Sequence, residues 1–196
     1  NNPLDNYFYS SAFNNGNTTI VSSSSTGKYS YGTTTFGIPD GKKIYCEVKM
    51  VAVSSGSLQA RVGLISYPTT SATISVGSTT YTYGYNTDSG NITTGNAGSS
   101  YGTAFALGDI MGIAIDTVNN KLYFSKNGTW QNSGDPTSGA TGTGAVSIAD
   151  LGTQSAANSG NYFLGFSDEG NTAGATLSWN FGNGYFGTTA VSSAGT

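Results

Sequence analysis

The amino-acid sequence predicts an all-β protein, an antiparallel β-sandwich of two sheets with almost no helix. Apolar residues alternate with small or polar residues in several short runs, which is typical of strands with one buried face. Stretches rich in Gly, Ser, Thr and Asn separate these runs. No segment repeats its apolar residues with the 3.6-residue period of a helix. The chain has 196 residues, which is enough for one sandwich to bury a core without disulfides.

We expect a single domain over residues 1–196 with three parts. Residues 1–33 form an N-terminal edge hairpin, with a turn at Gly16-Asn17 and a short strand after it. Residues 34–186 form the core of the sandwich, and residues 187–196 form a C-terminal tail.

The strand predicted within 108–116 has two different faces. Met111, Ile113 and Ile115 give one bulky face, and Gly112 and Ala114 give a face of small residues. Side chains of a strand alternate between its two faces. We therefore expect the bulky face to lie in the core and another backbone to approach the small face closely.

The next strand follows after an Asn-rich turn. Leu122 and Phe124 share its core face. Asn127-Gly128 is the dipeptide that best accepts positive φ in a two-residue hairpin turn. We expect positive φ at both positions and another strand from about Thr129.

The core is expected to close around the bulky residues of six strands. They are Ile44, Val48, Met50, Val62, Leu64, Met111, Ile113, Ile115, Leu122, Phe124, Leu164, Phe166, Leu177 and Trp179. Cys46, the only cysteine, shares a face with Ile44 and Val48 and is predicted to be buried and unreactive. Tyr81, Tyr83 and Tyr85 share a face of one strand, and packing is favoured over ligand binding for this row, although either face could point inward.

Long segments without predicted strands connect these runs. They span 66–80, 87–107, 131–144 and 150–161, with at most one helical turn near Ile148 to Gly152. Loops of this length on a β-sandwich usually carry its recognition surface.

Charge and composition exclude two classes of partner. Charged residues make up only 9% of the chain and the net charge is −3. The sequence therefore lacks the cluster of basic residues that is typical of nucleic-acid binding. No apolar stretch approaches the ~20 residues of a membrane span, so membrane insertion is not expected. Amide and hydroxyl groups dominate the sequence.

The absence of histidine removes most enzyme mechanisms. With no histidine and one cysteine, the chain has no Ser-His-Asp or Cys-His arrangement and no His-bearing metal site. Glycoside hydrolysis needs only two carboxylates, but the acids are scattered. Asp109 and Asp116 bracket a strand and Asp168-Glu169 are neighbours. We therefore expect no catalysis, no metal and no cofactor.

Several motifs occur together in the order of one known family. The strand within 108–116, the Asn-rich turn, the aromatic strand and Lys126-Asn127-Gly128 resemble the signature of SPRY (B30.2-like) domains, which have a concanavalin A-like sandwich. Matching segments occur at 43–48, 61–64, 81–85 with 88–90, 162–166 and 179–182. The resemblance covers roughly residues 34–186.

The resemblance implies a module that binds rather than catalyses. Partners of SPRY domains dock on loops at one end of the sandwich, which makes five residues candidates for ligand binding. They are Tyr85, Asn86, Asp88, Tyr101 and Trp130.

Flanking segments suggest a source for the domain. Residues 2–6, 15–19 and 34–38 resemble SPRY-like domains of tailed-phage structural proteins. This implies a virion-surface location, in a tail fibre, a head fibre or a capsid decoration. The expected partners are viral structural proteins or a host-surface glycan, and a homo-oligomer or larger assembly is expected. Two alternatives remain: a carbohydrate-active enzyme that uses only carboxylates, and a secreted extracellular bacterial adhesin or lectin domain.

Overall fold

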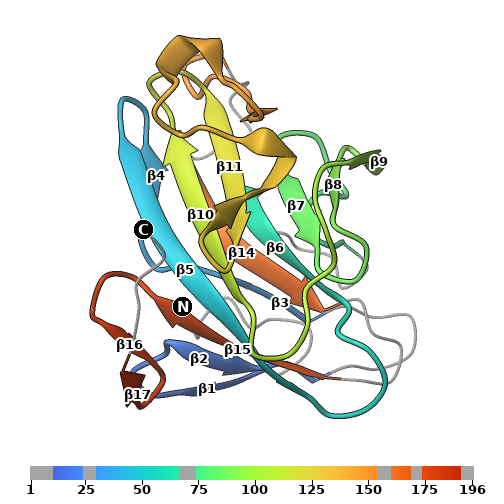
Figure 1. Cartoon of the computed structure of the whole chain (residues 1–196). Coiled ribbons are helices and arrows are strands. Elements are labelled where there is room, and N and C mark those ends of the chain that lie inside the picture. The colour runs from blue at the N-terminus through green and yellow to red at the C-terminus, as the bar shows by residue number, and fades with distance from the viewer. Residues whose placement is uncertain (1–10, 24–29, 67–73, 154–159, 169–173, 191–196) are drawn as a thin grey trace.

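The computed structural model describes residues 11–23, 30–66, 74–153, 160–168 and 174–190 as two antiparallel sheets packed face to face (Figure 1). Within these ranges no α-helix occurs, and the only helical segments are the 3₁₀ turns η2 (Gln131–Ser133) and η3 (Gly139–Thr141). The predicted all-β sandwich is confirmed. The segment 2–6 and the end of the predicted tail lie outside the described residues.

The first sheet has its strands in the order β1, β2, β15, β5, β10, β11 and β12, and β13 also pairs with β11. Their bounds are β1 Ala12–Asn14, β2 Thr19–Val21, β15 Ala175–Asn180, β5 Lys43–Val53, β10 Ile110–Asp116, β11 Lys121–Lys126, β12 Thr129–Trp130 and β13 Val146–Ser147. All of these pairings are antiparallel.

The second sheet has the order β3, β14, β6, β7, β8 and β9, and β4 also pairs with β14. Its strands are β3 Ser30–Thr33, β14 Asn161–Asp168, β6 Ala60–Ile65, β7 Tyr83–Asn86, β8 Asn91–Thr94, β9 Ala97–Ser100 and β4 Ile38–Pro39. A small hairpin of β16 (Tyr185–Phe186) and β17 (Thr189–Ala190) follows β15.

The core lies between the two sheets and contains the residues that alternation assigns to it. Every predicted core residue is buried except Ile44, which is half-buried and packs against the same cluster. Cys46 is 2% exposed. Burial raises the pKa of its thiol, with a smaller contribution from the charge of Glu47. The predicted burial of Cys46 is confirmed.

Three details differ from the sequence-based expectations. The stretch 87–107 contains the hairpin β8–β9, whose turn at Gly95-Asn96 has positive φ at both residues. Tyr81 precedes its strand in a turn with φ of 64°, so it leaves the predicted row, while Tyr83 and Tyr85 are buried. Residues 150–153 form a hydrogen-bonded turn, and the 3₁₀ turns occur earlier in the chain.

The turn at Asn127-Gly128 provides a test of the fold. The φ values are 48° at Asn127 and 82° at Gly128, as predicted, and β11 and β12 pair on either side. Gly128→Val places a β-branched side chain at positive φ and should destabilise the protein by about 1 kcal/mol or more. Urea unfolding measures the change. Gly98→Val is the matched control, because Gly98 is exposed, lies in a strand and has only the Thr93 hydroxyl near a new Cβ, at 3.9 Å. Equal stability of the two variants would contradict the assigned turn.

The Cys46 thiol provides a second test. Because the thiol is buried and its pKa is raised, a thiol reagent should label the native protein only as fast as the protein unfolds. Labelling should be immediate in guanidinium chloride. Rapid labelling of the native protein, with one reagent molecule per chain, would show that the thiol is accessible.

Candidate functional site

The outer face of the first sheet, which points away from the second sheet, carries an unusual set of side chains. On β5, Cys46 and Val48 are in the core. The strand period of two therefore directs Tyr45, Glu47 and Lys49 to the outer face. On β10, Met111, Ile113 and Ile115 are in the core, so the same alternation directs Gly112 and Ala114 to the outer face.

Pairing places these small residues between larger ones. Ala114 lies opposite Tyr45 on β5 and opposite Tyr123 on β11. At Gly112 a Cβ would lie 2.4 Å from Oγ of Ser125 and 2.7 Å from Oη of Tyr45. The small face of β10 therefore accommodates neighbouring side chains, which corrects the expectation that another backbone approaches it.

Three aromatic side chains, those of Tyr45, Tyr123 and Trp130, pack together on this outer face. The ring of Trp130, on β12, lies 6.3 Å from the Tyr45 ring and 6.4 Å from the Tyr123 ring, with interplanar angles of 70° and 75°. Edge-to-face contacts of this kind are favourable. Tyr123 is buried, and its Oη lies 3.3 Å from Oγ of Ser138 in the loop that follows β12. Tyr45 is 43% exposed and is available to a ligand.

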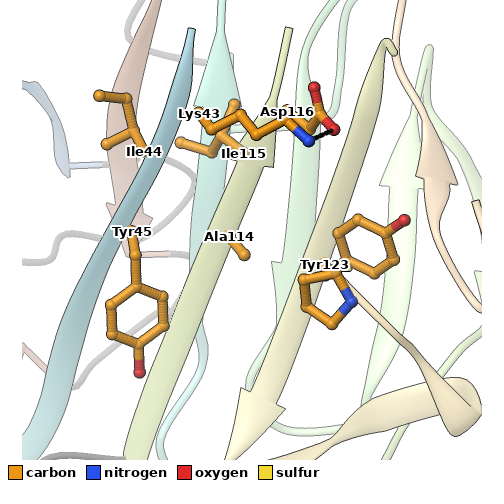
Figure 2. A pocket seen from close by; sticks show the side chains of 8 residues that line it. Lys43, Ile44, Tyr45, Ala114, Ile115, Asp116 and Tyr123 are labelled. Atoms are coloured by element: carbon orange, nitrogen blue, oxygen red, sulfur yellow. Dashed lines mark ion pairs between the residues drawn. The ribbon is translucent and has the colours of Figure 1, made fainter. Parts of the chain in front are cut away.

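Figure 2 shows the hollow beside these rings, with Tyr45 and Tyr123 on either side of Ala114. We call it the aromatic hollow; it is lined by Lys43, Ile44, Tyr45, Ala114, Ile115, Asp116, Tyr123 and Pro136. Its volume is about 200 Å³. Sites for drug-sized ligands usually have about 300–1,000 Å³, so the aromatic hollow fits one ring or one side chain of a larger partner.

Hydrogen bonds fix the polar groups around the hollow. The Tyr45 hydroxyl donates to Oε1 of Glu47 at 2.9 Å, and Nδ2 of Asn180 donates to Oε2 at 3.2 Å. Burial raises the pKa of Tyr45, and the interaction with Glu47 raises it further by a smaller amount. The phenol is therefore neutral at physiological pH, so it can take part in stacking and hydrogen bonding but does not act as a base.

The Lys43–Asp116 ion pair lies at one edge of the hollow, with 2.9 Å between Nζ and Oδ2 (Figure 2). The backbone and side-chain nitrogens of Asn119 also donate to the two Asp116 oxygens, at 3.0 and 2.7 Å. Burial alone would raise the pKa of Asp116, but the bonds from Asn119 and Lys43 outweigh burial and lower it.

The two acids near the hollow do not form a catalytic pair. Asp116 lies opposite Lys43, and Glu47 is four residues further along β5, a separation of about 13 Å at the usual rise per residue. Both oxygens of each carboxylate accept hydrogen bonds within the protein. Among the described residues no three His, Cys, Asp or Glu side chains group together as metal ligands.

The five residues suggested by the family resemblance lie on segments that hydrogen-bond to each other: the Gly102 N–H donates to the Gly90 carbonyl, and the Thr103 N–H donates to Oε1 of Gln131, the residue after Trp130. The five differ in exposure. Tyr85 is 0% exposed and Tyr101 is 8% exposed. Their rings pack edge-to-face on each other at 6.1 Å, and Tyr85 donates to the carbonyl of Thr103 at 2.7 Å. Burial raises the pKa of each of these tyrosines to about 12. Both rings are part of the core, so neither is presented to a ligand, which corrects their place among the candidates.

The remaining three candidates are half-buried or exposed. Asn86 is half-buried and accepts a hydrogen bond from the Thr93 hydroxyl at 3.3 Å. Asp88 is exposed in the loop after β7. Trp130 does not line the aromatic hollow, but it packs against Tyr45 and Tyr123, which do. Sequence reasoning missed Tyr45, although its outward position follows from the inward position of Cys46.

Comparisons with known proteins agree with this architecture. A family model described as "SPRY domain" matches residues 43–149. A crystal structure of a human SPRY domain is 18% identical, with a TM-score of 0.59 over 84% of this chain and 92% of that chain. The SPRY domain of human HERC1 is 17% identical, with a TM-score of 0.62 over 88% and 93% of the two chains. No curated protein matches the chain. Among the described residues no helix is both long and apolar enough to span a membrane.

The Lys43–Asp116 pair predicts how stability depends on pH. Because the folded-state pKa of Asp116 is lowered, its contribution is present above the unfolded-state pKa of about 3.9 and is lost as pH falls through the folded-state value. Asp116→Asn should therefore be less stable than the wild type at pH 7, and the difference should shrink below about pH 4. Urea unfolding of both proteins at pH 7 and below about pH 4 measures the difference in their free energy of unfolding. The exposed Asp88→Asn is the control, and a pH-independent difference for Asp116→Asn would contradict the assignment.

Proposed function

The chain belongs to the SPRY domain family, whose members are typically protein–protein interaction modules, and we propose that it is a non-catalytic recognition module on a virion surface. In this proposal it is part of a tail fibre, a head fibre or a capsid decoration. The aromatic hollow binds one sugar ring of a host-surface glycan. A neighbouring viral protein is the alternative partner.

The exposed ring of Tyr45 is the observation that carries this proposal. It is 43% exposed, its hydroxyl is fixed by Glu47, and the Trp130 ring packs against it at an interplanar angle of 70°. An aromatic side chain held in one orientation offers a flat apolar surface at a low cost in conformational entropy. The small volume of the hollow suits a single ring better than a whole ligand.

The state of the acids supports a binding role. Hydrolysis of a glycosidic bond requires one carboxylic acid and one carboxylate across the bond, about 5–9.5 Å apart. Glu47 is 3% exposed and bonded to Tyr45 and Asn180. Asp116 is held by Lys43 and Asn119. Neither carboxylate is presented to a ligand with an unoccupied oxygen.

Composition and edge strands support a place in an assembly. Charged residues are only 9% of the chain, and the strands β1 and β9 are at the edges of their sheets. All four residues of β9 are exposed, and exposed edges pair readily with neighbouring chains. Many copies on one particle would convert weak single contacts into strong attachment.

A binding screen with variants of Tyr45 and Trp130 tests the proposal. Purified protein is screened against host-surface polysaccharides and against virion proteins. Tyr45→Ala should reduce glycan affinity about tenfold or more, because truncation of a central aromatic contact costs more than about 1 kcal/mol. Trp130→Ala should also reduce it, because Trp130 does not line the hollow but packs against Tyr45 and Tyr123, which do. Leu107→Ala is the control, since Leu107 is 53% exposed and does not line the hollow.

Two results would overturn the proposal. Binding of a virion protein, with no glycan bound and no effect of either aromatic substitution, would place recognition elsewhere. A hydrolysis assay on the bound polysaccharides tests catalysis. Turnover that disappears in Glu47→Gln or Asp116→Asn would show that the domain is an enzyme.

A further inference from the structure

A second hollow lies on the same outer face, between the first sheet and the hairpin β16–β17. Its volume is about 210 Å³. Residues of β2, β5 and β15 line one side, and Phe186 to Thr189 line the other. Gly187, with φ of 61°, lies close to the sheet: a Cβ there would be 3.0 Å from Nδ2 of Asn15 and 3.1 Å from Oγ1 of Thr19. We call this space the lysine hollow, after Lys49.

Lys49 is half-buried and lines this hollow. Lys43 pairs with Asp116 and Lys126 pairs with Asp109, whereas Lys49 has no carboxylate partner within the described ranges. Glu47, two residues away on the same face, is bonded to Tyr45 and Asn180. A carboxylate in the hollow would form a charge-assisted hydrogen bond with this ammonium, so the position favours an anionic ligand.

Neutral polar groups surround this cation. Nδ2 of Asn15 donates to Oγ1 of Thr19 at 3.1 Å, and Oγ1 of Thr19 lies 3.0 Å from Oγ of Ser178. Ser178 is opposite Lys49 across the β5–β15 pair. Val51, 43% exposed, adds an apolar part to the lining. Hydroxyls and amides that can donate or accept, together with a small apolar surface, suit a sugar ring.

We propose that the lysine hollow binds the carboxylate of an acidic sugar, which makes the ligand of this domain an acidic glycan. The inference rests on the glycan-binding function proposed above and specifies the class of glycan. Tyr45 and Lys49 are four residues apart on β5, about 13 Å at the rise of a strand. One oligosaccharide lying along β5 would place a ring on Tyr45 and a carboxylate at Lys49.

The position of the hollow argues against an acidic peptide. Extended peptides usually bind by adding a strand to the edge of a sheet, where unpaired backbone groups are available. Lys49 is on β5, which is hydrogen-bonded to β10 on one side and to β15 on the other. A ligand of the lysine hollow therefore meets side chains on the face of the sheet and finds no backbone ladder to extend.

Matched pairs of oligosaccharides test the inference. Oligomers of glucuronate, galacturonate and sialate, and the same oligomers with their carboxyl groups reduced to alcohols, are titrated into the whole chain by calorimetry. At least one acidic oligomer should bind about tenfold more tightly than its reduced counterpart, and this preference should weaken as NaCl is added. Lys49→Gln should remove the preference while affinity for the reduced oligomer is retained.

Lys42→Gln is the matched control, because Lys42 is exposed and lines neither hollow. Urea unfolding of both variants checks that each is folded. Equal binding of an acidic oligomer to the wild type and Lys49→Gln would overturn the inference. A preference for reduced oligomers that depends on Trp130 would also overturn the inference. The glycan-binding function proposed above would still stand in that case. Lys49-dependent binding of a poly-glutamate peptide, without binding of any acidic oligomer, would replace the acidic glycan with an acidic protein segment.

Discussion

The register between β5, β10 and β11 is the constraint on which the rest of the structure depends. Because a strand repeats every two residues, burial of Cys46 and Ile113 also directs Tyr45 and Ala114 outward. A shift of one residue would bury Tyr45 and expose the core face. The same pairing that closes the sandwich therefore forms the floor of the aromatic hollow.

The outer face is held rigidly by interactions that a loop-based site would lack. Tyr45 is fixed through its hydroxyl by Glu47, and Trp130 packs on Tyr45 and Tyr123. The loop after β12 folds over Tyr123, and Figure 1 shows this segment crossing in front of β11. A site on paired strands loses little conformational freedom when a ligand binds, which suits the proposed role of a module that binds through many weak contacts.

Alternation predicted the buried face of each central strand, and Asn127-Gly128 predicted its turn, because both signals are local. The hairpin β8–β9 was missed because Ile92 is its only bulky residue. Tyr85 and Tyr101 were named as binding candidates, although packing was favoured for the strand that carries Tyr85. Their burial depends on contacts with Phe105 and Phe124. The lysine hollow was not predictable either, since it requires β16–β17 to lie near Thr19 and Lys49. Contacts between distant segments decide such features.

We propose that the face of the first sheet, and not the loops at an end of the sandwich, is the binding surface. Backbone amide and Trp130 indole NMR shifts, followed during titration with a bound oligosaccharide, test this claim most directly. We predict that the largest shifts belong to Tyr45, Ala114, Tyr123 and Trp130, along β5, β10, β11 and β12. Shifts confined to residues 86–90 and 101–109, whose backbones hydrogen-bond to each other, would contradict it.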